Sequence, residues 1–355
     1  MNLGIIGLPQ SGKTTVFNVL SHGDQPVVTS GGRFEVHTAV VDVPDSRLDQ
    51  LSELFKPQKT IYAKVTYGDI AGLGSGSGVE ISGALLNQLS QMEGFIHVVR
   101  CFESQEIPHP LGEINPLRDI QAMDAELLLN DQIAIERKLE RLTDERRKGG
   151  GRDKNLVDYE TNLFQRMQDF LATEKPLRDM QFSSDDERVL AGYGFLTRKP
   201  VSVLLNLGDG QVPPEIEYPH SRCVVASIQG KLEMEIAQLP LAEAQIFLDE
   251  YGITEPGLDK VIRCSYEMLD LLSFFTVGDD EVRAWTVKNG TKALEASGAI
   301  HSDLQKGFIR AEVISWEELL ALGSLAEARA KGKLRLEGKE YLLKDGEVMH
   351  VRFAV

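Results

Sequence analysis

The stretch Gly7-Leu8-Pro9-Gln10-Ser11-Gly12-Lys13-Thr14, with Thr15 following, decides the fold of this chain. It matches G-x-x-x-x-G-K-[ST], the pattern of a phosphate-binding P-loop. The apolar run 3–6 before it predicts a buried strand, and the apolar positions of 16–20 predict a helix that begins directly after it. This arrangement suits a phosphate, because backbone N–H groups and the helix dipole both face the anion. All four fixed positions are present, which disfavours the alternative of a glycine-containing turn without a ligand.

The polar positions of this loop have expected roles. Lys13 would reach the β- and γ-phosphates and is therefore a predicted catalytic residue, while the Thr14 hydroxyl would bind Mg²⁺. The predicted phosphate-binding residues are Pro9, Gln10, Ser11, Gly12, Lys13, Thr14 and Thr15.

The composition is that of a soluble globular protein with about two or three domains. The chain has 355 residues, 42% of them hydrophobic and 26% charged. No run approaches a transmembrane length, the N-terminus enters a strand rather than a signal peptide, and three widely spaced cysteines predict reduced thiols, so we expect a cytoplasmic protein. The net charge of −16 argues against indiscriminate binding to nucleic acid or an anionic membrane. We expect no membrane partner and no DNA partner, and any RNA contact needs a local basic patch.

A second motif, Asp69-Ile70-Ala71-Gly72, follows a strand predicted over 61–67. It fits D-x-x-G, in which the aspartate would hold Mg²⁺ through water and the Gly72 N–H would sense the γ-phosphate as part of the catalytic site. Position 73 is a leucine, whereas many GTPases have a glutamine there that orients the attacking water. Another group must therefore position the water. The glycine-rich run 74–83 is interpreted as switch II.

Other polar residues of this half of the chain carry weaker signals. In a G domain, residues 21–41 would contain switch I, and Thr29 and Thr38 are candidates for its Mg²⁺ ligand. Neither is fixed by a motif, and ordinary loop or strand threonines are the favoured interpretation. His97 lies in a predicted buried strand and is interpreted as a core residue. His109 lies in the following loop, where a surface histidine is the commoner case.

The run Asn206-Leu207-Gly208-Asp209 follows a predicted strand, at the place where N-K-x-D recognises the base in GTPases. The Asp209 carboxylate would accept hydrogen bonds from N1–H and the 2-amino group of guanine, which adenine lacks. Leu207 replaces the lysine that packs along the base. A last strand over 223–227 would close over the base. The predicted base-binding residues are Asn206, Leu207, Asp209, Ala226 and Ser227.

Between 115 and 178 the chain changes character. Leu128, Ile135 and Leu142 recur at intervals of seven, and glycines at 149–151 interrupt the pattern, which predicts an antiparallel coiled-coil arm of two helices. The tip, 136–154, has eight Lys/Arg against five Asp/Glu, a net charge of +3. A solvated hairpin tip and a contact with RNA phosphates remain equal alternatives.

The chain resembles the YchF family, the Obg-like ATPases. The resemblance spans nearly the whole chain and is carried by Gly7-Leu8-Pro9, Asp69-Ile70-Ala71-Gly72-Leu73, Val98-Val99-Arg100-Cys101-Phe102-Glu103 and the stretches 281–286, 306–314 and 332–338. It implies an α/β fold: a P-loop NTPase G domain, mostly parallel sheet flanked by helices, an inserted antiparallel α-helical coiled-coil arm, and a C-terminal α+β TGS domain, which is β-grasp-like. The expected bounds are 1–114 and 181–272 for the G domain, 115–180 for the arm and 273–355 for the TGS-type domain.

The same resemblance implies a function: Mg²⁺-dependent hydrolysis of ATP or GTP, and association with the ribosome or ribosomal RNA through the arm and the TGS domain. The family's loop histidine falls at His109, a candidate for positioning the water. The chain departs from the family at Gln10 and Ser11, in switch I, and at Asp209, where glutamate is common. The preference for ATP or GTP therefore stays open.

Three functions compete at this point. The first is a nucleotide hydrolase that acts as a switch on the translation apparatus, including a GTP-preferring regulatory GTPase as one form. The second is a P-loop kinase, which would need an acceptor site and an arginine-rich lid. The third is a nucleotide-binding scaffold with little hydrolysis, which Leu73 makes credible. The Asp69 and Asn206 motifs and the C-terminal module favour the first.

Overall fold

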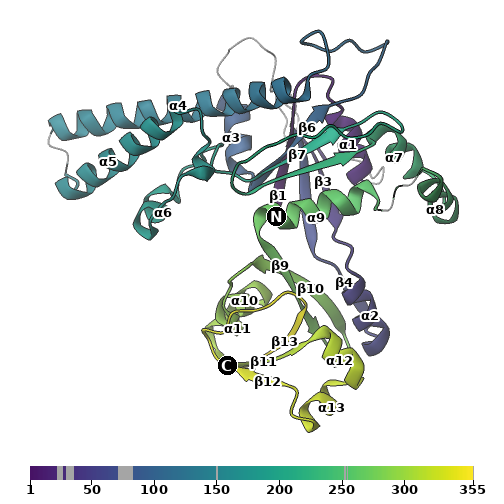
Figure 1. Ribbon diagram of the computed structural model, residues 1–355. Helices are drawn as coiled ribbons and strands as arrows, with labels where there is room; N and C mark the ends of the chain where they lie inside the picture. Colours follow the sequence, from purple (N-terminus) through teal and green to yellow (C-terminus); the bar gives the residue numbers. More distant parts are fainter. Residues whose placement is uncertain are drawn as a thin grey trace. The chain divides into compact units, whose positions relative to one another are not determined.

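The computed structural model (Figure 1) describes residues 1–21, 27–28, 36–70, 83–148, 151–251, 253 and 255–354. Contacts between residues divide the chain into two units. The first comprises 1–40 and 66–264, and the second comprises 41–65 and 265–355. Among the described residues, no helix is long and apolar enough to cross a membrane.

The first unit is built on a seven-stranded sheet with the strand order β2-β3-β5-β1-β6-β7-β8. The strands are β1 (Asn2–Ile6), β2 (Val27–Val28), β3 (Val36–Asp42), β5 (Lys64–Ile70), β6 (Gly94–Arg100), β7 (Val201–Asn206) and β8 (Cys223–Ile228). The pairs from β5 through β1, β6 and β7 to β8 are parallel, and β2 pairs antiparallel with β3. Strands β6 and β7 are buried along their whole length, which explains their continuous apolar sequences.

Helices flank this sheet. They are α1 (Lys13–Leu20), α3 (Gly83–Gln91), α7 (Gly230–Ile236), α8 (Leu241–Glu250) and α9 (Gly257–Leu269), the last of which continues into the second unit. Side chains of α3 and of the first half of α4 (Pro116–Lys148) pack with β1, β6 and β7 in one apolar core. Helix α1 packs against β1 and α7. The parallel sheet with flanking helices confirms the predicted α/β class.

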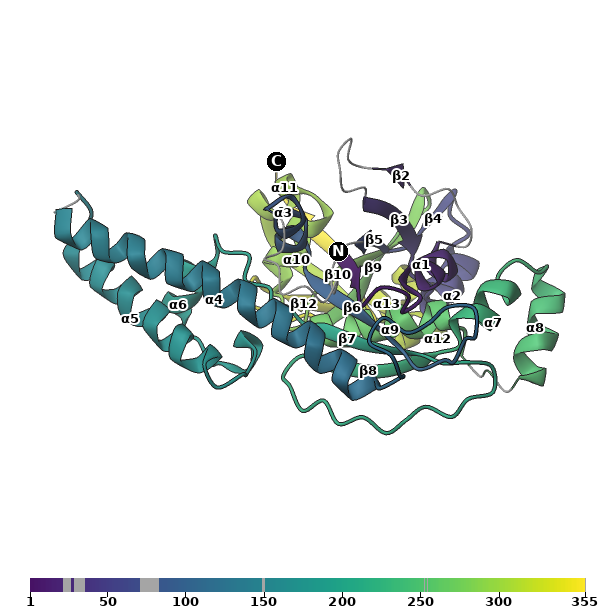
Figure 2. The ribbon, with the colours of Figure 1, turned by 90° about the horizontal axis from the view of Figure 1, so that it is seen from above.

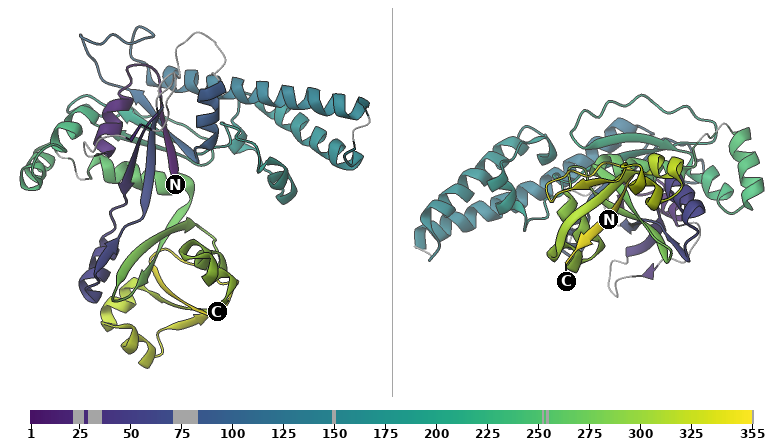
Figure 3. Two further views of the ribbon diagram at one scale, coloured as in Figure 1. Left: turned by 180° about the vertical axis from the view of Figure 1, so that it is seen from behind. Right: turned by 90° about the horizontal axis from the view of Figure 1, so that it is seen from below.

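The predicted arm is present as two long antiparallel helices, α4 and α5 (Lys154–Leu171), which lie side by side in Figures 2 and 3. Ile135 and Leu142 of the seven-residue pattern are buried between them, together with side chains of α5. Helix α5 begins after Asp153, whose carboxylate accepts a hydrogen bond from the Asn155 N–H at 2.9 Å. A short 3-10 helix η1 (Leu177–Asp179) and α6 (Ser184–Leu190) lead back to β7.

The second unit contains a six-stranded sheet with the order β12-β11-β13-β9-β10-β4. The strands are β4 (Lys59–Ile61), β9 (Leu271–Val277), β10 (Glu281–Lys288), β11 (Phe308–Ser315), β12 (Arg335–Glu337) and β13 (Glu347–Phe353). The helices are α2 (Ser46–Phe55), α10 (Ala293–Ile300), α11 (Ser302–Lys306), α12 (Trp316–Leu322) and α13 (Leu325–Ala330). Helix α10 contributes to the core on one face of the sheet, and α2 and α12 contact strands of the sheet and each other.

The segment 41–65 belongs by its contacts to the second unit, whereas the expected bounds placed it with 1–114. Strand β4 pairs parallel with β10, with Lys59 opposite Glu281, and α2 packs on β9 and β10. The single strand predicted over 61–67 is wrong for the same reason: the structure has β4 and β5 there, which pair in different sheets. The local sequence pattern carries no information about a pairing partner more than 200 residues away.

Candidate functional site

The P-loop connects β1 to α1 in a conformation that requires glycine. Gly12, the residue before the helix, has φ 94°, and a Cβ at this position would lie 2.2 Å from Nδ2 of Asn206. A Cβ at Gly7 would lie 2.4 Å from the carbonyl oxygen of Val98 on β6. Both approaches are far below van der Waals contact, so the two motif glycines let neighbouring strands close onto the loop.

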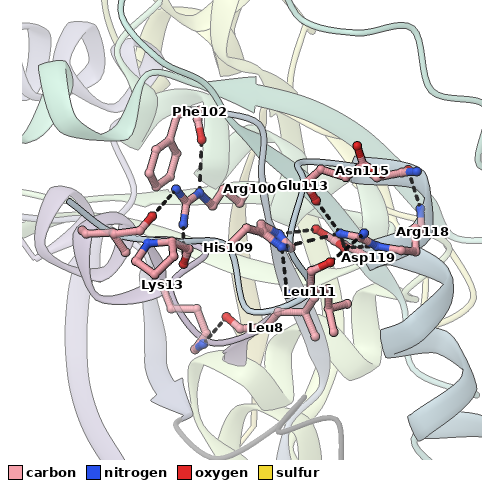
Figure 4. A network of polar contacts seen from close by, with 12 residues as sticks. Leu8, Lys13, Arg100, Phe102, His109, Leu111, Glu113, Asn115, Arg118 and Asp119 are labelled. Atoms are coloured by element: carbon pink, nitrogen blue, oxygen red, sulfur yellow. Dashed lines mark hydrogen bonds and ion pairs between the residues drawn. The ribbon is translucent and has the colours of Figure 1, made fainter. Parts of the chain in front are cut away.

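The Lys13 side chain folds back over this loop. Its ammonium donates hydrogen bonds to the carbonyl oxygens of Gly7 and Leu8, each at 2.9 Å, and Figure 4 shows the contact with Leu8. Burial lowers the pKa of the amine, and the nearby Asp69 carboxylate acts in the opposite direction. Phosphate oxygens would displace the two neutral carbonyls, because a hydrogen bond between an ammonium and an anion is the stronger one.

Thr14 and Asp69, the two predicted metal ligands, are in direct contact. The parallel pairing of β1 with β5 sets Ile5 opposite Asp69, and the Thr14 hydroxyl donates to Asp69 Oδ2 at 3.0 Å. Asp69 is buried, and its Oδ1 has no hydrogen-bond partner among the described residues. A buried carboxylate oxygen without a partner is costly, and a Mg²⁺ ion with its water shell would satisfy it.

The donor set fits Mg²⁺ rather than a metal held entirely by protein. Among the described residues, no group of three or more His, Cys, Asp or Glu side chains could hold a metal ion. Mg²⁺ commonly takes one or two protein oxygens and completes its shell with water and phosphate oxygens. Thr14 and Asp69 would supply the protein part of such a shell.

Several predicted residues of this region lie outside the described residues: Gly72, Leu73, the run 74–82 and Thr29. Their roles at the γ-phosphate stay predictions. Thr38 is described, and it lies in β3 opposite Val27 of β2. This places it in a regular strand, as the favoured interpretation expected.

Asn206 connects the P-loop to the first residue of α7. Its Nδ2 donates to the carbonyl of Ser11 at 3.0 Å, and its Oδ1 accepts from the Gly230 N–H, the first residue of α7, at 3.2 Å. Asn206 is buried at the C-terminal end of β7. One amide therefore holds together the P-loop, β7 and α7.

A pocket of about 370 Å³ lies beside this amide. It extends from Thr15 of α1 to Asp209, and Phe102 and Lys231 also line it. Its position after the C-terminal ends of β6 and β7 is where open α/β sheets bind ligands. Phosphate at the P-loop and a base beside Asp209 would therefore belong to one nucleotide.

Phe102 and Lys231 are among the lining residues of this pocket that sequence reasoning missed. Phe102 follows β6, and the Arg100 guanidinium lies over its ring at 4.5 Å from the centroid. Lys231 is the second residue of α7. The position of Phe102 directly after a buried strand was the available signal, since side chains there gather at the ligand edge of the sheet. No local pattern marks Lys231.

The other predicted base-binding residues do not all line the same cavity. Ser227 lines a second cavity of about 210 Å³ with Leu207 and Lys260, and its hydroxyl accepts a hydrogen bond from Lys260 Nζ at 3.4 Å. Leu207 is buried and contributes to both cavities. Ala226 lies within β8 opposite Leu204 and lines neither cavity. The structure therefore brings Asn206, Leu207 and Asp209 together and leaves Ala226 in the strand.

His109 is held in the loop between β6 and α4. Its Nε2 lies 2.8 Å from Asp119 Oδ2, and its Nδ1 accepts a hydrogen bond from the Leu111 N–H at 3.1 Å (Figure 4). Arg118 also binds Asp119 and donates to the carbonyl oxygens of Leu111 and Glu113. Because both ring nitrogens have partners, a water could bind the imidazole only by replacing one of them. The predicted water-positioning role therefore stays a prediction that requires this loop to move.

Arg100 fixes the other end of the same loop. The buried guanidinium donates to the carbonyl oxygens of Phe102 at 3.1 Å and Ile107 at 2.7 Å, and burial lowers its pKa. The pocket wall formed by Phe102 and Ile107 is thus set by a residue of the sheet.

Comparisons with known proteins find relatives over the whole length of the chain. The family model YchF-GTPase_C, described as a protein of unknown function, matches residues 271–354. The "Ribosome-binding ATPase YchF" of Bacillus subtilis (strain 168) is 37% identical over 368 residues, covering 100% of both chains. The protein of the same name from Escherichia coli O157:H7 is 38% identical over 362 residues, covering 99% of each. The solved "Structure of the Schizosaccharomyces pombe YchF GTPase" superposes with a TM-score of 0.80 at 29% identity, covering 99% of this chain and 97% of that one.

Proposed function

The chain belongs to the YchF family, and from this premise we propose that it is a P-loop hydrolase of ATP or GTP that uses Mg²⁺ and acts as a nucleotide switch on the ribosome. One observation carries the metal-dependent part. The Thr14 hydroxyl and the Asp69 carboxylate are paired at 3.0 Å beside the P-loop, and Oδ1 of that carboxylate has no partner among the described residues. A nucleotide with Mg²⁺ would satisfy both this oxygen and the Lys13 ammonium.

The residues of the chain divide the work of phosphoryl transfer. The P-loop N–H groups and Lys13 would bind and orient the β- and γ-phosphates, and Thr14 and Asp69 would hold the metal. Mg²⁺, when bound, neutralises the charge that develops on the phosphate oxygens. Catalysis of this kind depends mainly on positioning. The hydrogen bonds of Asn206 to Ser11 and Gly230 would therefore contribute to catalysis by fixing the shape of the P-loop.

The base is proposed to lie in the pocket that Phe102, Asn206 and Asp209 line. Relatives are named as ATPases and the solved fission-yeast structure as a GTPase. Asp209 supports guanine recognition, whereas Leu207 offers no lysine to pack along the base. Both purine nucleotides are therefore proposed substrates, and a GTP-preferring enzyme is the alternative.

The proposed partner is the ribosome, because the relatives are named ribosome-binding. The arm and the C-terminal unit would make the contact. The nucleotide state would act through residues 74–83, the proposed switch II.

A paired titration with non-hydrolysable ATP and GTP in Mg²⁺ tests the nucleotide assignment. A tenfold tighter binding of ATP, about 1.4 kcal/mol, would mean that Leu207 and its surroundings outweigh Asp209. Tighter binding of GTP would mean that Asp209 recognises guanine. Binding of neither nucleotide would contradict the proposed function.

Hydrolysis measured with and without ribosomes separates a switch from a scaffold. The scaffold alternative has one specific observation in its favour, namely that both ring nitrogens of His109 are already bonded. A switch predicts that ribosomes raise the rate of phosphate release. A rate that stays near the buffer background with ribosomes present would support the scaffold.

A further inference from the structure

Lys231 is the one cation among the described residues that line the pocket of about 370 Å³ beside Asn206. The carboxylates of Glu103, Glu106 and Asp209 line the same pocket. Lys231 is exposed, and within the described parts of the chain it has neither an ion pair nor a side-chain hydrogen bond. Its charge is therefore not used by the fold and is available to a ligand in the pocket.

The start of α7 fixes the backbone from which this side chain extends. The Gly230 N–H donates to Asn206 Oδ1 at 3.2 Å, and a Cβ at position 230 would lie only 2.8 Å from that oxygen. Asn206 in turn donates to the carbonyl of Ser11 at 3.0 Å. Lys231 follows directly on Gly230, so its Cα is held one residue away from a buried amide that also binds the P-loop.

Asp209 lies in a loop that is anchored on both sides. The side chain of Gln229, the residue before α7, accepts a hydrogen bond from the Gly210 N–H at 2.9 Å. Gln211 accepts from the Gly208 N–H at 2.9 Å and donates to the first backbone carbonyl after β6, also at 2.9 Å. The loop that carries Asp209 is therefore tied to α7 on one side and to the end of β6 on the other.

These anchors give one pocket an acceptor and a donor of opposite charge. An ionised carboxylate such as that of Asp209 only accepts hydrogen bonds, and the Lys231 ammonium only donates them. The edge of guanine has the complementary groups, because N1–H and the 2-amino group donate while O6 accepts. Adenine has a 6-amino donor in place of O6, and it offers a carboxylate one donor group instead of two.

We propose that Lys231 is a specificity-determining residue whose ammonium donates a hydrogen bond to O6 of a guanine base. The inference rests on the proposed function, because it takes this pocket as the site of the base. Lys231 would supply from α7 the cation that Leu207 does not provide at its own position. Lys231 thus raises the affinity for guanine nucleotides relative to adenine nucleotides, alongside the contact of Asp209 with N1–H and the 2-amino group.

The test uses Lys231→Met in the full-length protein, which keeps an apolar stem and removes the ammonium. Lys231→Arg keeps a cationic donor. Lys175→Met is the matched control, because Lys175 is also an exposed lysine of the first unit, has no ion-pair partner among the described residues and lines neither cavity of the site.

Isothermal titration in Mg²⁺ measures the affinity for four nucleoside diphosphates, which lack the γ-phosphate that hydrolysis would remove. GDP and IDP both have O6, and IDP lacks only the 2-amino group. ADP and 2-amino-ADP both have a 6-amino group in place of O6. The series therefore separates the contact at O6 from the contact at the 2-amino group.

We expect Lys231→Met to weaken GDP and IDP by the same factor, about fivefold to tenfold, because a hydrogen bond from a charged donor is lost. The affinities for ADP and 2-amino-ADP should stay unchanged, and Lys231→Arg should keep the preference for O6. The ratio of GDP to IDP affinity, which reports the contact of Asp209 with the 2-amino group, should be the same in Lys231→Met and the wild type. Lys175→Met should bind all four as the wild type does.

Three results would overturn this proposal while leaving the nucleotide assignment intact. Equal weakening of all four diphosphates would show that the ammonium acts on the phosphates. A loss confined to ADP and 2-amino-ADP would place it at N1 of adenine. Unchanged affinities would show that it contacts no part of the nucleotide. A wild type that binds none of the four contradicts the proposed function itself, and this proposal with it.

Discussion

Nε2 of His109 and Oδ2 of Asp119 lie 2.8 Å apart, and the two side chains are only 2% and 3% exposed. The first residue lies in the loop that follows β6, and the second lies in the first turn of α4. The pair therefore ties the wall of the nucleotide pocket to the base of the arm within one buried hydrogen bond. Any loop movement that frees the imidazole also changes what α4 contacts.

Replacing His109 with alanine should reduce the turnover of ATP or GTP while leaving nucleotide affinity unchanged, since the proposed contact is with the attacking water. A general acid–base or water-positioning group typically contributes about 10²–10⁴-fold. Single-turnover hydrolysis and equilibrium titration measure the two quantities separately. His301→Ala, at an exposed histidine of the second unit, is the control. Unchanged turnover would remove His109 from the mechanism.

Asp69→Asn should make nucleotide binding insensitive to Mg²⁺. The amide keeps the shape and can still accept from the Thr14 hydroxyl, but it cannot hold the metal as a carboxylate does. We expect the affinity of the variant in Mg²⁺ to equal that of the wild type in EDTA, and hydrolysis to be lost. Isothermal titration with and without EDTA measures this. A variant that retains the full Mg²⁺ effect would show that the metal is bound elsewhere.

Asp209→Asn should weaken GTP binding by at least tenfold, about 1.4 kcal/mol, and leave ATP binding unchanged. The neutral amide cannot accept the two hydrogen bonds that guanine donates from N1–H and its 2-amino group. Adenine has neither donor. Asp279→Asn, at a surface aspartate of the second unit, provides a charge-matched control. Equal losses for both nucleotides would instead indicate that Asp209 only shapes the pocket.

The stability of the first unit should depend on pH through Asp131 of α4. Burial raises the pKa of Asp131 to about 6, although Thr197 and Leu196 donate hydrogen bonds to its carboxylate. The folded state therefore binds more protons than the unfolded state between about pH 4 and pH 6. The contribution of Asp131 to the free energy of unfolding is present below pH 4 and falls by up to about 3 kcal/mol as the pH rises to 6.

Chemical denaturation at a series of pH values tests this dependence, with Asp131→Asn as the variant that cannot titrate. We expect the slope between pH 4 and pH 6 to be more negative in the wild type than in the variant. Parallel curves would show that the carboxylate keeps an ordinary pKa and that its three hydrogen bonds outweigh its burial.

The strand, loop and helix that form the proposed phosphate site were predictable because they are local in sequence. A strand, a glycine loop and a helix start within 20 residues, and the spacing of Gly12, Lys13 and Thr14 dictates their arrangement. The arm was predictable for the same reason, since Ile135 and Leu142 recur within one helix. The periodicity of apolar residues indicates which face of a helix is buried. The P-loop and the arm can therefore each be recognised from a short stretch of sequence, without knowing which distant residues they contact.

What could not be predicted depends on contacts between distant residues. Nothing near Lys231 marks it as a wall of the proposed nucleotide pocket, and no pattern near Asn206 shows that its amide reaches Ser11. The run 308–314 is an apolar strand in sequence, yet Glu312 is buried within it and accepts hydrogen bonds from Arg329 and Arg352. That Arg329 and Arg352 share this carboxylate becomes visible only when the packing of distant elements is known.

The inclusion of residues 41–65 in the C-terminal unit has a consequence for truncation and recombination of the gene. A stop codon placed before Ser265 would remove the strands that cover α2, and Leu48 and Leu51, fully buried in the complete protein, would face water. A single genetic crossover that replaced only the 3′ part of the gene would join α2 and β4 to a foreign sheet. The two stretches are therefore expected to be inherited and to diverge together, although more than 190 codons separate them.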